Sequence, residues 1–214
     1  MTERNLPLLS PVQARVLGVL VEKQHTVPDT YPLSLNALVA GCNQKTSRDP
    51  VMNITEGEAQ AAIDELKHLS LVMEGPASRV TRYEHAMDRV LRLPSQSVAI
   101  LTVLMLRGPQ TPGELRINCE RLHKFADISS VEAFLNELRD RAAGALVVEL
   151  PRKPGARENR WAHLLSGEPI VDAVVSEASS DSAEADLRTR VAWLEREVAD
   201  LKAVVDKLRA DLGA

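Results

Sequence analysis

Two stretches of the chain repeat one pattern: an apolar-faced helix, a short strand, a basic turn rich in glycine and proline, and a closing strand. The closing strand reads Arg82-Tyr83-Glu84-His85 in the first stretch and Arg160-Trp161-Ala162-His163 in the second. A winged-helix domain ends in this way, with a helix followed by a two-stranded wing. The sequence therefore predicts a mainly α (α+β) fold: two tandem winged-helix domains, each a helix-turn-helix plus β-wing, then a C-terminal helix or coiled coil.

Changes in composition along the chain predict four segments. We expect a first winged-helix domain over residues 1–93 and a second over 94–167. Residues 168–186 are rich in Ser, Ala, Asp and Glu without periodicity, which indicates a flexible acidic linker. Residues 187–214 then form a short coiled-coil helix.

Helix-capping patterns set the limits of the helices in the first domain. Ser10 followed by Gln13, and Thr55 followed by Glu58, have the spacing of capping boxes, and Ser34 can cap a short helix between them. The third helix should turn four apolar residues inward, Ala59, Ala62, Ile63 and Leu66.

The second domain repeats this order with fewer residues. Thr111-Pro112-Gly113-Glu114 supplies a cap, a proline at the first helical position and the acid of a capping box. The inward face of the third helix is Val131, Phe134, Leu135 and Leu138, which match Ala59, Ala62, Ile63 and Leu66 at a constant offset.

Eight basic residues are candidates for contacts with nucleic-acid phosphates, because cations on a wing can neutralise the DNA backbone. They lie on the two wing turns and on the polar stretch 43–49: Arg79, Arg82, Arg152, Lys153, Arg157, Arg160, Lys45 and Arg48. The alternative is that the wing arginines are ordinary solvated side chains of an exposed turn.

Net charge and the third helices favour a different partner. The chain carries a formal charge of −4, and residues 168–214 alone carry −5, with 6 Lys and Arg against 11 Asp and Glu. The outward faces of both third helices are rich in carboxylates, including Glu58, Asp64 and Glu65 in the first domain and Glu132 and Glu137 in the second. A helix that reads the major groove needs Arg, Lys, Asn or Gln there. The acidic helices therefore suggest a protein partner instead.

A heptad pattern near the end of the chain predicts a homodimer. Valine predominates at the a positions and leucine fills the d positions, which favours a parallel two-stranded coiled coil. The candidate dimerisation residues are Leu187, Val191, Leu194, Val198, Leu201, Val205, Leu208 and Leu212. The alternative is one amphipathic helix that folds back onto the globular part.

No sequence motif indicates catalysis, so we expect no enzymatic activity, no cofactor and no metal. The two cysteines, Cys42 and Cys119, are isolated, and the five histidines are scattered. His85 and His163 occupy equivalent strand positions, which suggests a repeated structural role. The chain has no run of eighteen apolar residues and no signal-peptide pattern, so we expect a cytoplasmic protein without membrane contact.

Two longer runs resemble a known family. Glu22 to Met52, EKQHTVPDTYPLSLNALVAGCNQKTSRDPVM, and Arg107 to Arg116, RGPQTPGELR, are similar to the signatures of the YceH-like family of bacterial proteins. The resemblance covers roughly residues 8–166 and implies a tandem winged-helix fold and a cytoplasmic bacterial protein. It implies no catalytic or ligand residues. The polar residues of the first run are candidates for an exposed shared surface, or they shape the turn between helices: Asn43, Gln44, Lys45, Ser47, Arg48 and Asp49.

These observations lead to two hypotheses of function. The first is a dimeric, DNA-associated protein of transcription-regulator type, with the basic wings on duplex DNA and the heptads pairing two chains. The second is a protein–protein interaction module that keeps the winged-helix scaffold and has lost DNA readout.

Overall fold

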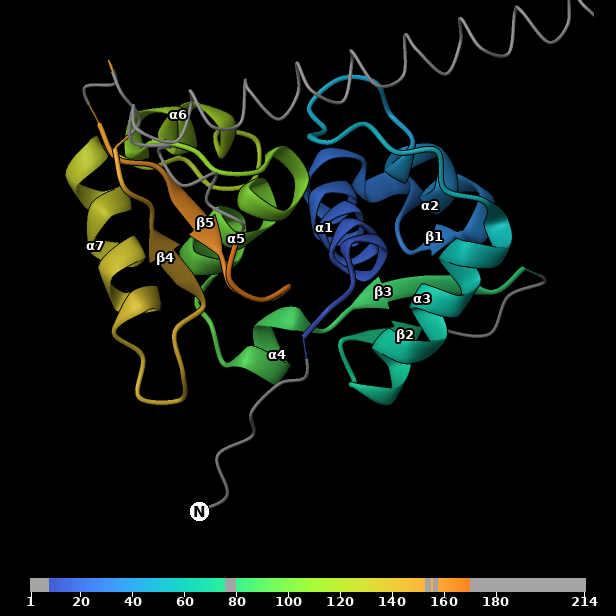
Figure 1. Cartoon of the computed structure of the whole chain (residues 1–214). Coiled ribbons are helices and arrows are strands. Elements are labelled where there is room, and N and C mark those ends of the chain that lie inside the picture. Colours follow the sequence, from blue (N-terminus) through green and yellow to red (C-terminus); the bar gives the residue numbers. More distant parts are fainter. Residues whose placement is uncertain (1–7, 76–79, 153–154, 156–157, 170–214) are drawn as a thin grey trace, which may run out of the picture. The chain divides into compact units, whose positions relative to one another are not determined.

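The computed structural model describes residues 8–75, 80–152, 155 and 158–169 (Figure 1). About half of these residues are helical, and the protein is a mixed α/β structure with small antiparallel sheets. The elements of the first repeat are α1 (Pro11–Thr26), the 3₁₀ helix η1 (Pro28–Thr30), β1 (Leu33–Ser34), α2 (Leu35–Cys42), α3 (Glu56–His68), β2 (Val72–Glu74), β3 (Arg82–His85) and α4 (Met87–Leu91). Those of the second are α5 (Ser95–Arg107), α6 (Pro112–Asn118), α7 (Ile128–Arg139), β4 (Val147–Glu149) and β5 (Trp161–His163).

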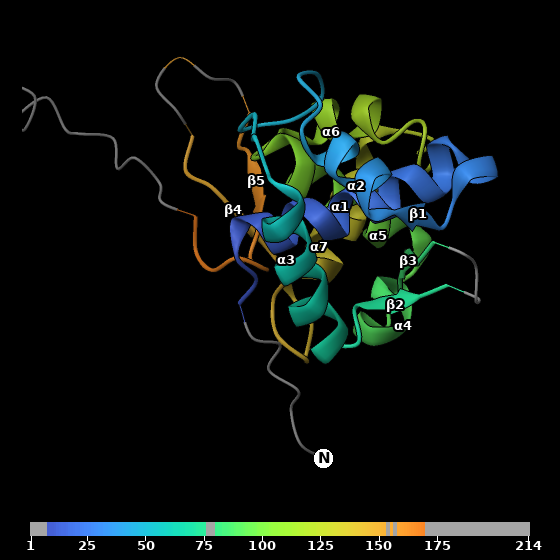
Figure 2. The same ribbon diagram turned by 90° about the vertical axis from the view of Figure 1, so that its right-hand side faces the viewer.

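Both repeats place their elements in the same order. In the first, β1 pairs with β3, and β3 pairs with β2, so the strand order is β1-β3-β2. In the second, a single bridge between Gln110 and Trp161 takes the place of β1 beside the hairpin of β4 and β5. Each third helix packs beside the first strand of its hairpin, α3 against β2 and α7 against β4 (Figures 1 and 2).

The helix starts follow the predicted caps. Ser10, Thr55 and Thr111 each accept the backbone N–H three residues on, and each forms a complete capping box. Ser34 caps α2 through the N–H of Ala37. The capping box of α7, in which Asp127 faces Ser130, was not predicted.

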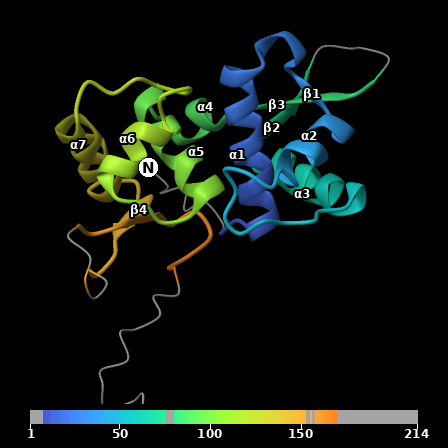
Figure 3. The ribbon, with the colours of Figure 1, turned by 90° about the horizontal axis from the view of Figure 1, so that it is seen from above.

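The first helix of each repeat is buried on almost all sides. Every residue from Ala14 to Val21 in α1 is buried, and so is every residue from Ser97 to Leu106 in α5. The reason is that α1 packs against α2 and α3 on one side and against α5 on the other (Figure 3). A helix with apolar residues all round is stable only when it is enclosed in this way.

The two repeats share one hydrophobic core. A Cβ atom added to Gly18 of α1 would lie 3.0 Å from the Cδ2 atom of Leu106 in α5, so the two backbones come close together here. The buried apolar residues form a continuous cluster from Leu9 to Leu165. Leucine, valine, isoleucine and alanine make up most of this cluster, as the low aromatic content requires.

The predicted tail lies outside the described residues. This applies to the heptads of 187–214 and to all of the acidic linker except Glu168 and Pro169. The predicted boundary at residue 93 falls between α4 and α5. None of the described helices is long and apolar enough to cross a membrane.

Candidate functional site

The two hairpins hold the repeated Arg-aromatic-x-His motif in the same register. The facing pairs are Glu74–Tyr83 and Val72–His85 in the first hairpin, and Glu149–Trp161 and Val147–His163 in the second. The alignment of the two motifs in the sequence is therefore also an alignment in the structure. It allows the two repeats to be compared residue by residue.

The two motif histidines are enclosed by the fold, and the buried Nδ1 atom of His163 has no hydrogen-bond partner among the described residues. The Nδ1 atom of His85 accepts the backbone N–H of Met87 (3.3 Å), so its Nε2 atom carries the proton, 2.7 Å from the Oε1 atom of Gln24. Burial lowers the pKa of His85 and of His163 to about 4. Both rings are therefore neutral, and they pack the ends of the hairpins against the helices.

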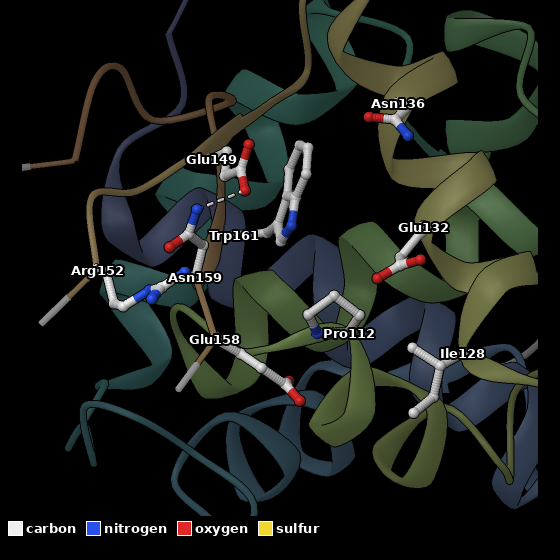
Figure 4. A pocket seen from close by; sticks show the side chains of 9 residues that line it. All are labelled: Pro112, Ile128, Glu132, Asn136, Glu149, Arg152, Glu158, Asn159 and Trp161. Atoms are coloured by element: carbon white, nitrogen blue, oxygen red, sulfur yellow. Dashed lines mark hydrogen bonds between the residues drawn. The ribbon is translucent and has the colours of Figure 1, made fainter. Parts of the chain in front are cut away.

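A pocket of about 360 Å³ lies in the second repeat, between α7, the start of α6 and the hairpin (Figure 4). Nine residues line it: Pro112, Ile128, Glu132, Asn136, Glu149, Arg152, Glu158, Asn159 and Trp161. Glu132 on α7 and Glu158 on the hairpin extend from opposite sides toward the space beside Pro112, and the Trp161 ring stands between α7 and Asn159 (Figure 4). The pocket thus combines apolar surfaces with carboxylates from two elements.

The acidic side chains of this pocket are incompletely paired. The Glu149 Oε1 atom accepts a hydrogen bond from the Nδ2 atom of Asn159 (2.7 Å). Within the described part of the chain, Glu132 and Glu158 make no side-chain hydrogen bond or ion pair, and Arg152 pairs with no carboxylate. Among the described residues of the lining, three carboxylates stand against one guanidinium.

Four of the predicted phosphate-binding residues are exposed, and one of them is already bonded. Lys45, Arg82, Arg152 and Arg160 have exposed side chains. Arg82, however, donates to the backbone oxygens of Thr30 (3.2 Å) and Pro32 (2.8 Å), which ties β3 to the turn before β1. Arg79, Lys153 and Arg157 lie outside the described residues.

The prediction of an exposed Arg48 is wrong. Its side chain has 0% exposed surface, and its guanidinium binds the Glu22 carboxylate through both Nη atoms, at 3.1 and 2.6 Å. It also donates to the backbone oxygens of Gly41 and Ser47 and to the side-chain oxygen of Gln44. Because every nitrogen of the group has a partner within the protein, Arg48 holds the chain after α2 in place and has no free donor for a phosphate.

The rest of the polar stretch 43–49 also shapes the structure. The Asn43 side chain exchanges two hydrogen bonds with the backbone of Ile54 (2.8 and 2.7 Å), and Asn43 and Gln44 are half-buried, where exposed residues were expected. Ser47 accepts a hydrogen bond from Arg107 (2.7 Å). Asn43, Gln44 and Arg48 therefore shape the turn. Lys45, Ser47 and Asp49 remain exposed, as expected for a shared surface.

The two runs that resemble the YceH-like family, residues 22–52 and 107–116, come together where the stretch 43–49 contacts the end of α5. The backbone N–H of Asp49 donates to the backbone oxygen of Leu106 (2.8 Å), beside the Arg107–Ser47 hydrogen bond. The stretch after α2 is thereby fixed to the end of α5. Much of the sequence that resembles a known family therefore builds the junction between the repeats.

Arg15 is a buried cation that the sequence analysis did not single out. It is 1% exposed and donates to the backbone oxygens of Cys42 (3.1 Å) and Pro50 (2.7 Å), and its Nε atom has no partner. Burial, followed by the nearby charge of Arg48, lowers its pKa. Its position inside the apolar run from Val12 to Val21 was the available signal.

The carboxylates predicted on the third helices are exposed. On α3, Glu58, Asp64 and Glu65 face solvent, and on α7, Glu132 and Glu137 do so. Gln60 and Lys67 on α3 are half-buried because they contact the hairpin. Among the residues that the structure describes, no three His, Cys, Asp or Glu side chains lie close enough to hold a metal ion, and Cys42 and Cys119 are buried.

Comparison with known proteins gives a family match without an activity. Residues 9–156 match the family model described as "Protein of unknown function, DUF480". A UPF0502 protein of Dechloromonas aromatica (strain RCB) is 62% identical over 202 residues, which cover 93% of this chain and 95% of the relative. A UPF0502 protein of Burkholderia multivorans is 61% identical over 218 residues, which cover 99% of this chain and 92% of the relative.

Proposed function

The chain belongs to the DUF480 family of bacterial proteins, and within it we propose a non-enzymatic protein–protein interaction module built on two tandem winged-helix domains. The exposed carboxylates on α3 and α7 carry this proposal. In a winged-helix protein that reads DNA, the third helix enters the major groove, where phosphates repel carboxylates.

The order of elements supports the winged-helix assignment, which also fits the resemblance to the YceH-like family. Each repeat has a helix, a short strand or bridge, two further helices and a hairpin, and the short strand pairs beside the second hairpin strand. The third helix of each repeat packs beside its hairpin, and the hairpin has the position of the wing in a winged-helix domain.

The heptad residues of 187–214 complete the proposal, because Val at a and Leu at d favour a parallel dimer. Two chains joined at their ends would present two copies of each acidic helix to a partner. A cytoplasmic location fits a protein with two unpaired cysteines.

Duplex DNA is the second candidate partner, and the exposed side chains of Arg152 and Arg160 on the second hairpin favour it. In that case the wing would lie on the phosphate backbone and the acidic helices would stay out of the groove. Arg48 and Arg82 contribute little to such a surface, since both are bonded within the protein.

Two parallel measurements separate these candidates. The full chain is titrated against a fluorescent 30-base-pair duplex at low salt, and it is also used to capture partners from nuclease-treated bacterial extract. The matched variants are Asp64→Asn with Glu65→Gln on α3, Glu132→Gln with Glu137→Gln on α7, and Arg152→Ala with Arg160→Ala on the hairpin.

The proposal expects a captured protein that is lost with the α3 or α7 variants and kept with the hairpin variant. It also expects no duplex binding by the wild type. Duplex binding that the hairpin variant loses, and that the α7 variant strengthens, would instead establish the DNA-associated function.

A further inference from the structure

The residues that line the pocket of the second repeat have counterparts in the first repeat that bond to one another. Leu66 and Leu138 mark the common register of α3 and α7, 72 positions apart. In that register Glu132 and Asn136, which line the pocket, correspond to Gln60 and Asp64 of α3. Arg139, which lies over the Trp161 ring, corresponds to Lys67. The strand register adds the correspondence of Glu149 with Glu74, and of Trp161 with Tyr83.

In the first repeat these groups satisfy one another. The Lys67 ammonium forms an ion pair with the Glu74 carboxylate. The Tyr83 hydroxyl donates to the Oε1 atom of Gln60 (3.2 Å), and the Gln60 amide donates to Asp64 (3.0 Å). In the first repeat the glutamate of strand β2, Glu74, is therefore paired with a cation from the third helix.

In the second repeat the corresponding cation is held elsewhere. Arg139 binds the neighbouring Asp140 through two nitrogens, at 2.8 and 2.9 Å, and its Cζ atom lies 5.7 Å from the centroid of the Trp161 ring. Among the described residues Glu149 accepts a hydrogen bond from the neutral amide of Asn159 and feels the charge of Arg139 without forming an ion pair with it. Trp161 has no hydroxyl to bond Glu132. The place that Lys67 occupies in the first repeat becomes part of an open pocket.

We propose that this pocket binds an arginine side chain from a basic segment of a partner protein. In the first repeat the corresponding cation is the protein's own Lys67. The inference rests on the protein-interaction function proposed above and specifies the chemistry of the partner. A guanidinium can bond carboxylates on two sides at once, and it stacks on aromatic rings more readily than an ammonium does.

The pocket matches that side chain in shape and in charge. Its volume of about 360 Å³ exceeds that of one long side chain, so neighbouring backbone of the partner also fits. Pro112, Ile128 and the Trp161 ring provide apolar contact for the aliphatic stem, and Glu132 and Glu158 approach from opposite sides (Figure 4). The contact of Arg139 with Trp161 shows that this ring already accepts one guanidinium.

The test is an NMR titration of the full chain with the peptide acetyl-Gly-Gly-Arg-Gly-Gly-amide. Two matched peptides carry citrulline, which keeps the shape and removes the charge, or lysine in place of arginine. The readouts are the Trp161 indole signal and the backbone amides of Glu132, Asn136 and Glu149. Glu132→Gln with Glu149→Gln is the pocket variant, and Glu137→Gln is the control on an exposed position of α7 outside the pocket.

We expect the arginine peptide to shift these signals, the citrulline peptide to leave them in place, and the lysine peptide to bind more weakly. The pocket variant should raise the Kd at least about fivefold, which corresponds to about 1 kcal/mol, while E137Q stays within twofold. Unchanged thermal unfolding of the variants confirms that they fold.

Three results would overturn the inference: no shift with the arginine peptide, equal affinity for citrulline or lysine, or an unchanged Kd in the pocket variant. Shifts of the same signals by the 30-base-pair duplex would assign the pocket to nucleic acid instead. Failure here is distinct from failure of the proposed function. If a captured protein is lost with the α3 variant but the arginine peptide does not bind, the protein-interaction function is supported and the arginine pocket is rejected.

Discussion

The Nη2 atom of Arg48 lies 2.6 Å from the Oε2 atom of Glu22, and the arginine side chain is fully enclosed. This ion pair joins the end of α1 to the stretch that follows α2. Burial alone would raise the pKa of Glu22, but the hydrogen bonds and charge of Arg48, together with Lys23, bring it below its ordinary value. The pair is therefore ionised at neutral pH.

Glu22→Gln should lower the free energy of unfolding by about 3 kcal/mol, because it leaves the buried Arg48 guanidinium without its counter-charge. Urea denaturation measures this value. The control is Glu65→Gln, which removes an exposed carboxylate from α3 and should change stability by less than about 0.5 kcal/mol. If both variants had the same free energy of unfolding, the Arg48–Glu22 ion pair would not contribute to the stability of the fold.

Two glycines should respond to alanine in opposite directions. A Cβ atom at Gly41 would lie 2.6 Å from the Cγ1 atom of the buried Val19, so Gly41→Ala should cost about 1–3 kcal/mol. A Cβ atom at Gly57 meets nothing within 4 Å, and α3 gains helix propensity there, so Gly57→Ala should stabilise by about 0.4–1 kcal/mol. Thermal unfolding compares the two variants. A destabilised Gly57→Ala protein would contradict this reading of α3.

Stability should fall with acidification between pH 6.5 and pH 4. The folded pKa of His85 and His163 is about 4, below the unfolded value of about 6.5, so the unfolded chain binds more protons in this window. The stability that both rings contribute is complete above pH 6.5 and is lost as the pH falls. Their joint slope is about 2.4 kcal/mol per pH unit near pH 5.5.

The matched variant for this effect is His163→Asn, which removes one of the two titrating rings. Averaged between pH 6.5 and 5, its slope should be smaller by about 1 kcal/mol per pH unit. Urea midpoints taken at several pH values give the slope. A variant with the full slope of the wild type would place the proton uptake on other groups.

The heptad prediction is tested by removing the tail. Light scattering of a chain that ends at Gly167 should give the mass of a monomer, and that of the full chain the mass of a dimer, since Val at a and Leu at d favour two strands. A truncated chain that keeps the dimer mass would mean that other residues pair the two copies.

Local signals in the sequence were enough to predict most of the secondary structure. Ser10, Thr55 and Thr111 mark three helix starts, and the matched motifs around Tyr83 and Trp161 mark both hairpins. These features depend on neighbours within a few residues.

The roles of individual polar residues could not be predicted in this way. Arg48 stands in a polar stretch and looks like a surface residue, but its partners Glu22 and Gly41 are brought to it by the packing of α1 against α2. The pocket likewise needs α7 and the hairpin to converge. Glu132 and Arg152 were noted separately in the sequence, and nothing in it placed them around one cavity with Trp161.

The close contact of Gly18 with Leu106 has a consequence for how the chain unfolds. Because α1 and α5 bury each other, neither repeat can expose its core without exposing part of the other. The two repeats should therefore unfold in one cooperative transition. Calorimetry should then give a calorimetric enthalpy of unfolding equal to the van't Hoff enthalpy. What began as a duplicated pattern then behaves in solution as a single thermodynamic unit.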